Sequence, residues 1–250
     1  MAEEKKFPSE IIDLPSKGTL YPEGHPCSDG KVELKYMTAK EEDILTSQNL
    51  IKKGVAVDKL LESLIVNKDL SLEDLLLGDK YAVMVAARIL AYGADYGVQI
   101  THPDSGEKIE HTFNLADCPF KTIPEGIKEN KFEMTLPVSK TKITFRLLTG
   151  KEEKLIDKEL VGSKKIGSDI SPELTTRLRY VITSVDGDTD QSLINSFVQN
   201  MLARDSLALR QEINKVSPDI EMKQNIEVGG EVVSVDIPLT TEFFWPKADW

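Results

Sequence analysis

The chain has 250 residues and a formal net charge of −11, with ordinary apolar and charged fractions for a globular protein. This length suits two modest domains, and the acidic balance excludes a general nucleic-acid binder, because neutralising phosphates requires clustered Lys and Arg. No apolar run approaches the ~20 residues that a membrane span needs, so we expect no membrane partner.

Residues 1–30 are rich in Pro and Gly and predict an extended N-terminal arm. No apolar segment follows the first six residues, which excludes an ordinary signal peptide. Two interpretations stay open: the arm docks on a partner, or it packs along its own domain. The candidates for partner contacts in the arm are Leu14, Pro15, Lys17, Tyr21 and Pro22.

A stretch in residues 36–45 recurs in residues 147–156, with Thr and Lys-Glu-Glu identical and the apolar positions in register. Thr38 with Glu41, and Thr149 with Glu152, have the spacing of a capping box, in which two unpaired amides at a helix start are satisfied reciprocally. An alternating segment precedes each copy, which predicts a strand running straight into a helix. Chance recurrence of a common cap is the alternative, but the matched flanks favour duplication.

The first copy continues with helical patterns and ends in a hairpin. A capped helix is expected over about 39–52, an apolar stripe at helical spacing follows at residues 60–65, and a further helix is expected over about 79–92. Alternating runs on both sides of Ser105-Gly106 predict a β-hairpin that ends near residue 115.

The second copy repeats this order after a linker over residues 116–130. We expect a hairpin turning at Ser139-Lys140, helices over about 150–161, 172–184 and 190–214, and a mobile loop over 162–169. A second Gly-Glu hairpin follows, in which Gly230-Glu231 aligns with Gly106-Glu107.

The predicted fold class is therefore α+β, with two tandem duplicated modules after the extended arm. The modules cover 31–115 and 131–240, and the segment 241–250 forms an aromatic tail. Each module is expected to run from a strand or hairpin through helices to a C-terminal β-hairpin with the outline of a degenerate zinc ribbon.

Candidate metal ligands are too few for a site. His102 and Ser105 stand where a zinc knuckle would place thiolates, but structural zinc normally takes four N or S ligands. Cys27 and Cys118 are isolated, which predicts no disulfide and fits a reducing cytoplasm. Residues 186–190 imitate the start of a calcium loop, but the mid-loop Gly and the final Glu are missing. We expect no metal and no cofactor.

Catalytic motifs are also missing, since no phosphate-binding loop, nucleophile elbow or His-Glu-x-x-His occurs. We therefore expect no enzyme. The tail instead places four aromatic residues in its last ten positions, and aromatics cluster in cores and at interface hot spots. Packing on its own domain is favoured for Phe243 and Phe244, whereas Trp245 and Trp250 are candidates for partner contacts.

Several of these stretches together resemble the baseplate hub and hub-assembly chaperone family of contractile-tailed phages of the T-even type. The resemblance covers about residues 11–246. The resemblance rests on five motifs: Leu-Pro-Ser-Lys-Gly-x-x-Tyr-Pro at 14–22, Tyr-Met-Thr-Ala-Lys-Glu-Glu-Asp-Ile-Leu at 36–45, the Gly-Glu hairpins, Ala-Arg-Asp-Ser-Leu at 203–207 and Phe-Phe-Trp-Pro at 243–246. Relatives often carry Cys-Pro-x-Cys-Gly at the hairpins, which this chain lacks.

The resemblance implies a non-enzymatic protein that acts in assembly of the tail's central hub, in the host cytoplasm. The partners that it implies are other hub proteins or the tape-measure protein. An assembly factor that leaves the particle and a structural subunit retained in the virion baseplate both remain open, with an unrecognised hydrolase as a weaker third class. The sequence also leaves a homo-oligomer open.

Overall fold

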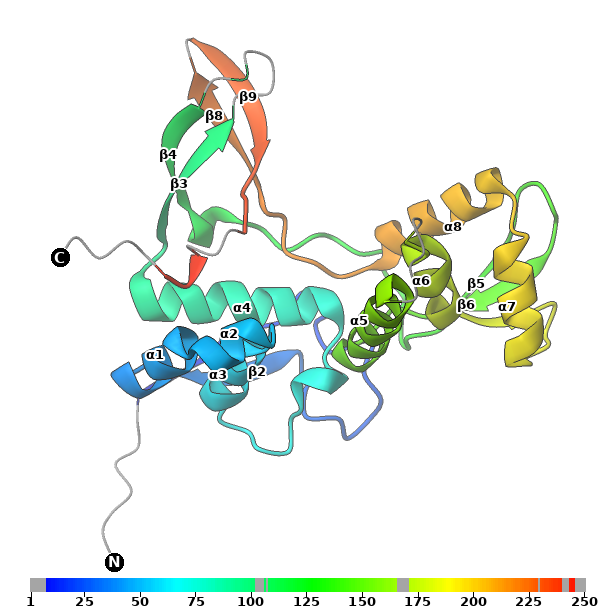
Figure 1. Cartoon of the computed structure of the whole chain (residues 1–250), viewed down its shortest axis with the longest axis horizontal. Coiled ribbons are helices and arrows are strands. Elements are labelled where there is room, and N and C mark those ends of the chain that lie inside the picture. The colour runs from blue at the N-terminus through cyan, green and yellow to red at the C-terminus, as the bar shows by residue number, and fades with distance from the viewer. Residues whose placement is uncertain are drawn as a thin grey trace, which may run out of the picture.

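A computed structural model describes residues 8–101, 106, 108–165, 171–228, 230–239 and 243–245. The described chain is α+β, with eight α-helices and four small antiparallel sheets. In Figure 1 one group of helices lies on the left and a second group, with its sheet, on the right, while two β-hairpins rise together above the first group.

The first half begins with a hairpin that leads into four helices. Val32 and Leu34 point into the core from the second strand, as their alternation with exposed residues predicts. The helix expected over 39–52 is broken at Ser47, whose extended backbone separates two helices. The elements are β1 (Ser9–Asp13), β2 (Lys31–Lys35), α1 (Ala39–Thr46), α2 (Gln48–Lys52), α3 (Ala56–Leu64), the 3-10 helix η1 (Leu72–Asp74), α4 (Leu77–Tyr92), β3 (Asp95–Thr101), β4 (Lys108–Asn114) and the 3-10 helix η2 (Leu115–Asp117).

The expected N-terminal arm is largely part of the first sheet and core, which corrects the prediction of an extended arm. Strand β1 pairs antiparallel with β2, with Ile12 opposite Val32. The loop between the strands then turns inward, because Leu14, Leu20 and Cys27 are buried in the core. The apolar residues of this segment explain the outcome: they cover the same core that the helices cover.

The second half repeats the opening hairpin and adds a third strand. The segment expected as a helix over 172–184 divides, because residues 182–185 form a strand that pairs with β6. The helix expected over 190–214 is interrupted at residues 200–202, and α5 extends through residues 162–165, where a loop was expected; residues 166–170 lie outside the described part. The elements are β5 (Phe132–Thr135), β6 (Lys142–Phe145), α5 (Gly150–Lys165), α6 (Glu173–Val181), β7 (Ile182–Val185), α7 (Gln191–Gln199), α8 (Ala203–Val216), β8 (Lys223–Val228) and β9 (Glu231–Asp236).

The last hairpin, β8–β9, lies beside β3–β4 of the first half (Figure 1). The Tyr96 hydroxyl donates to the Pro238 carbonyl at 3.0 Å, and the Gln224 amide donates to the Asn114 carbonyl at 2.7 Å. Phe243 packs edge-on against Tyr96. The C-terminal part of the chain therefore completes the first half, so the boundaries predicted at 115 and 131 do not separate two independent cores.

The two halves share an order of elements and several matching contacts. In both, a Thr that directly precedes a helix follows within four residues of the end of a hairpin strand. A later segment then pairs with the far edge of that strand: Ile65 with Leu34, and β7 with β6. Each half ends with a helix followed by a two-stranded hairpin. The second half has one full helix, α7, where the first has the short η1.

Candidate functional site

The two halves meet where the start of α5 lies against the start of α4. Leu76 and Thr149 form an isolated antiparallel bridge, in which the Gly150 amide donates to the Leu75 carbonyl at 3.0 Å. Two glycines permit close approaches of the backbone around this junction, Gly150 to η1 and Gly78 to the segment after α8. A Cβ on Gly78 would lie 1.8 Å from the Pro218 carbonyl oxygen, and one on Gly150 would lie 2.6 Å from that of Leu72.

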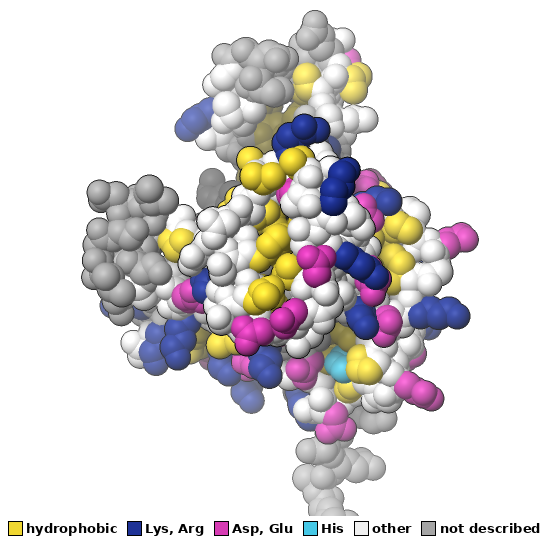
Figure 2. All heavy atoms as spheres, turned by 90° about the vertical axis from the view of Figure 1, so that its right-hand side faces the viewer, with side chains coloured by type: hydrophobic (Ala, Val, Ile, Leu, Met, Phe, Trp, Pro, Cys, Tyr) yellow, Lys and Arg dark blue, Asp and Glu magenta, His cyan; other side chains and the backbone are white. Residues whose placement is uncertain are grey.

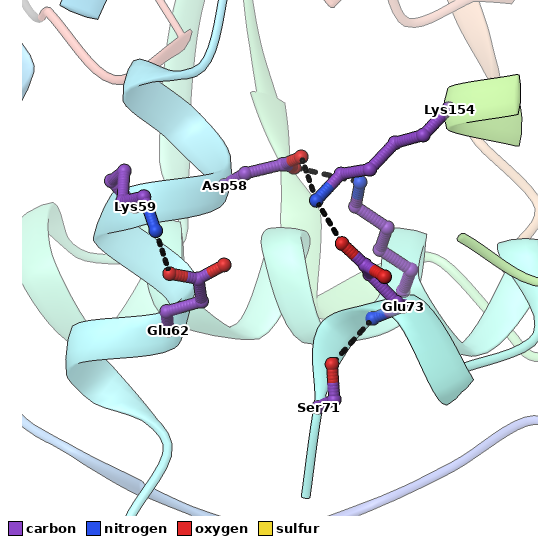
Figure 3. Close-up of polar contacts among 7 residues, drawn as sticks. Asp58, Lys59, Glu62, Ser71, Glu73 and Lys154 are labelled. Atoms are coloured by element: carbon purple, nitrogen blue, oxygen red, sulfur yellow. Dashed lines mark hydrogen bonds and ion pairs between the residues drawn. The ribbon is translucent and has the colours of Figure 1, made fainter. Parts of the chain in front are cut away.

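Ion pairs join the halves at the same junction (Figure 3). Lys154 of α5 lies 2.9 Å from Glu73 of η1 and 3.9 Å from Asp58 of α3, which also pairs with Lys80 at 2.7 Å. The hydrogen bond and charge of Glu73 raise the pKa of Lys154. These side chains are partly exposed, so each pair is worth at most about 1 kcal/mol.

The predicted helix caps lie at the starts of α1 and α5. In the first, the Thr38 amide and hydroxyl both donate to the Glu41 carboxylate, and in the second Thr149 does the same to Glu152. Glu41 also accepts from Lys35 at 2.7 Å and from Ser63 at 2.9 Å. Although burial acts to raise it, these hydrogen bonds lower the pKa of Glu41 to about 2.

Two buried aspartates, for which the sequence predicted no role, hold the turns that follow β1 and β5. Asp79 accepts from the Ser16 amide at 3.0 Å and the Tyr21 hydroxyl at 2.7 Å. Asp205 accepts from the amides of Val138 and Ser139 at 2.8 and 3.0 Å. Each aspartate is the third residue of its helix, and each turn contains Leu-Pro followed by Ser-Lys, so this shared signal was present in the sequence.

An open groove lies beside the junction, between α4, α6 and α8. It has a cavity volume of about 370 Å³. Tyr81 and Leu174 line it and are 45% and 44% exposed, so they give the groove an accessible apolar surface. We refer to it below as the junction groove. Its apolar lining includes Leu76, Leu77, Tyr81, Leu174, Leu178 and Ile213.

Three arginines and one aspartate supply the charge of the junction groove. Arg146 pairs with Glu152, and Arg177 makes a two-pronged contact with Glu153 at 2.7 and 2.8 Å. Arg210 has no ion pair or hydrogen bond to any other described residue, and burial raises the pKa of Asp219. The groove is therefore apolar with three arginines at its rim, two of which are already paired with glutamates.

A second cavity, beside β3 and β4, has a structural explanation. Arg88 projects into it from α4, donates to the carbonyls of Gly93 and Asp95 at 2.8 and 3.2 Å, and lies over the rings of Tyr92 and Tyr96. An arginine that satisfies carbonyls just beyond a helix C-terminus fixes the connection to the next strand.

Most of the predicted partner-binding residues lie inside the fold. Leu14, Pro15 and Tyr21 are buried, so their side chains contact the chain's own core, whereas Lys17 and Pro22 are exposed. Tyr21 is fixed by Asp79, and its hydroxyl also accepts from the Leu76 amide at 3.0 Å. Trp245 packs against the core beside the buried pair Phe243 and Phe244, and Trp250 lies outside the described residues.

No group of three or more His, Cys, Asp or Glu side chains able to hold a metal occurs among the described residues. His102 and Ser105 are outside them, and Cys118 is buried with its sulfur 3.6 Å from the Gln224 amide. In the suspected calcium loop, Asp190 caps α7 by accepting from the amides of Ser192 and Leu193. Within the described helices, none is long and apolar enough to cross a membrane.

Comparison with known proteins identifies the family of the chain. The family model described as T4 bacteriophage base plate protein matches residues 9–245. The chain belongs to this family. The matched residues include β1, the helix caps at Thr38 and Thr149, the hairpins β3–β4 and β8–β9, and Trp245. The comparisons with curated proteins and with solved structures each gave no match.

Proposed function

We propose that this base plate family protein is a non-enzymatic factor in assembly of the central hub of a contractile tail. In this role it binds another hub protein or the tape-measure protein in the host cytoplasm. The junction groove carries the proposal, because its exposed Tyr81 and Leu174, and an Arg210 that pairs with no other described residue, suit a protein segment with apolar side chains and a carboxylate. The alternative is a structural hub subunit retained in the mature virion.

A pull-down with purified hub and tape-measure proteins tests the binding role. Leu174→Glu and Arg210→Glu should each weaken capture, because both introduce a negative charge where we expect an apolar or acidic contact. Val232→Glu is the matched control, since Val232 is an exposed apolar residue on β9, outside the groove lining. Equal capture by all four proteins would rule out the groove as the binding site.

Mass spectrometry of purified virions separates the two roles. An assembly factor should be absent from mature particles and present in extracts of infected cells. A structural subunit should be found in the particles in a fixed ratio to other hub proteins.

We also propose that the chain arose by internal duplication of one module. The support is the shared set of contacts: Thr38 and Thr149 at helix starts, Lys35 and Arg146 paired with the capping glutamates, and the two buried aspartates that hold equivalent turns. In that case the hairpins β3–β4 and β8–β9 descend from one ancestral hairpin of zinc-ribbon type. Superposition of the halves with Asp79 on Asp205 is the test, and different chain directions at the matched positions would refute it.

A further inference from the structure

Two helices, α6 and α8, each present one continuous face to the junction groove. On both, the lining residues stand at positions i, i+3, i+4 and i+7, so each face is two helical turns or roughly 10 Å long. The two sets are Leu174, Arg177, Leu178 and Val181 of α6, and Arg210, Ile213, Asn214 and the C-terminal cap Ser217 of α8. The groove therefore matches a bound segment about two helical turns long.

The backbone around the groove is already hydrogen-bonded within the chain. The buried lining residues Leu147 and Leu148 form its floor. The Leu147 amide and carbonyl both bond to the side chain of Asn130, at 2.7 and 3.0 Å, and the Leu148 carbonyl accepts from the Leu77 amide at 3.3 Å. The walls are helices, whose interior backbone groups bond within the helix. A bound segment thus finds few backbone partners here.

A segment on this surface must therefore satisfy its own backbone. An extended segment needs a strand edge to pair with, and each of its amides or carbonyls left buried without a partner costs about 1–3 kcal/mol. A helix bonds these groups internally and offers apolar side chains along one face. Only that face enters the groove, so the cavity of about 370 Å³ receives side chains and not the whole helix.

The charged lining residues define where a charge suits the bound helix. Two of the three arginines already pair with glutamates of α5. Arg210 is exposed and has no ion pair or hydrogen bond to any other described residue, so it is available to a carboxylate. Asp219, which follows the end of α8, also lines the groove and repels a carboxylate placed near it.

We propose that the junction groove binds an amphipathic α-helix of the partner protein. The helix places apolar side chains at i, i+3 or i+4, and i+7 between α6 and α8, covers the exposed Tyr81 and Leu174, and sets a carboxylate against Arg210. Apolar burial supplies the affinity, and the pair with Arg210 fixes the position of the helix along the groove. This inference rests on the proposed function, because it names the form of the segment that the same groove binds.

A second apolar surface supplies the control. Figure 2, which looks onto the right-hand end of Figure 1, shows hydrophobic side chains gathered in the middle of that face. The N-terminal part of α8 lies at this end (Figure 1), and its Leu207 is 47% exposed, close to the 44% of Leu174. Leu207 is outside the groove lining. Leu207→Glu therefore adds the same charge at an equally exposed leucine elsewhere on the molecule.

Selection from a yeast-displayed library of random peptides tests the form of the ligand, with peptides of about 16 residues to allow four helical turns. The baits are the full chain, Leu174→Glu and Leu207→Glu. Leu174 lies in the first turn of α6, where glutamate favours the helix dipole, so the fold is kept. Peptides that bind the wild type and Leu207→Glu but not Leu174→Glu should carry apolar residues at i, i+3 or i+4, and i+7. Alternating apolar residues, or no peptide that depends on Leu174, would overturn the proposal.

Substitutions in a selected peptide test the helix and its carboxylate by fluorescence anisotropy. A proline in the middle of the peptide should abolish binding, because it breaks the helix. Exchanging the acidic residue of the peptide for lysine should weaken binding to the wild type roughly tenfold and restore binding to Arg210→Glu. A peptide that tolerates the proline would refute the helix, and equal affinities in all four charge combinations would refute the contact with Arg210.

Capture of whole proteins separates this inference from the proposed function. If a hub or tape-measure protein binds the wild type but not Leu174→Glu, while the selected peptides are not helical, only the form of the ligand is refuted. If helical peptides bind in the groove but neither protein is captured, only the assembly role is refuted.

Discussion

Glu41 illustrates how single residues of this chain do more than one structural task. Its carboxylate receives the amide and hydroxyl of Thr38, the ammonium of Lys35 and the hydroxyl of Ser63 on α3. It therefore caps α1 and also joins α1 to the neighbouring helix and to β2. A buried carboxylate with this many donors is stabilised in its charged form, which makes its contribution dependent on pH.

Replacing Glu41 should reveal that dependence. The pKa of Glu41 in the folded protein is about 2, below its ordinary value of 4.5, so its stabilisation is complete above pH 4.5 and disappears as the pH falls toward 2. Glu41→Gln should lower the free energy of unfolding by on the order of 3 kcal/mol at neutral pH and by little near pH 2. Urea unfolding at several pH values measures this.

The exposed Glu125 supplies the control for that experiment. Glu125→Gln should leave the free energy of unfolding unchanged at each pH. If the difference between wild type and Glu41→Gln persisted undiminished at pH 2, the hydrogen bonds to the carboxylate would not be its source.

At the scale of elements, packing reverses an ordinary helix preference at Gly78. Alanine usually stabilises a helix relative to glycine by roughly 0.5–1 kcal/mol. Here the added Cβ would lie 1.8 Å from the backbone of Pro218, so α4 and the segment after α8 must separate. From the sequence alone, one would expect alanine at position 78 to stabilise the protein.

Gly78→Ala should therefore lower the melting temperature, while Gly162→Ala should raise it or leave it unchanged. Gly162 lies within α5, and a Cβ built there meets nothing within 4 Å. Differential scanning calorimetry of both variants measures the contrast. Equal effects of the two substitutions would show that the approach of Pro218 is not a constraint.

Strand β1 and the loop after it form a second element whose role depends on packing. A free arm would be removable without loss of stability, but β1 pairs with β2 and the following loop buries Leu14 and Leu20. Deleting residues 1–20 should therefore unfold or strongly destabilise the protein, since each buried leucine lost costs about 2–5 kcal/mol.

Thermal melting of the truncated chain is the measurement. Lys17→Ala and Pro22→Ala, at exposed positions of the same segment, are the controls and should melt close to the wild type. A truncated chain with an unchanged melting temperature would mean that β1 contributes nothing to the fold.

At the scale of the whole molecule, the last hairpin completes the first half of the chain. Segment 118–121 pairs with the chain near Ile220, because Glu221 donates to the Pro119 carbonyl at 2.8 Å and Lys121 donates to the Asp219 carbonyl at 2.9 Å. Tyr96 and Phe113 of the first hairpin are buried, and Phe243 from the C-terminal segment packs on Tyr96. The two halves thus share a core.

A fragment ending at residue 130 should therefore fail to fold alone. It lacks β8–β9 and Phe243, and loss of one core aromatic already costs about 3–5 kcal/mol. Amide NMR of the fragment, compared with the full chain, measures this. Dispersed amide signals from the fragment would show that the first half is an independent domain.

The sequence by itself determined the local structure of this protein and the base plate family to which it belongs. Some sequence patterns act over only a few residues: alternating apolar residues, Thr-x-x-Glu spacing and Gly-containing turns. The strands β2 and β6, the caps at Thr38 and Thr149, and the hairpins β3–β4 and β8–β9 were therefore predictable from the sequence. Strand pairing by residues 182–185 was not, because it depends on β6, a segment far away in the sequence.

Only the tertiary structure decided which surfaces are covered. Burial of Leu14 and Tyr21, the contact of β8–β9 with β3–β4, and exposure of Tyr81, Leu174 and Leu202 depend on how the halves approach each other. Apolar composition gives the same free-energy gain for any contact that removes water, so it does not choose the partner. Backbone geometry does choose it, since glycine at 78 and 150 lets two chain segments come closer than a Cβ permits.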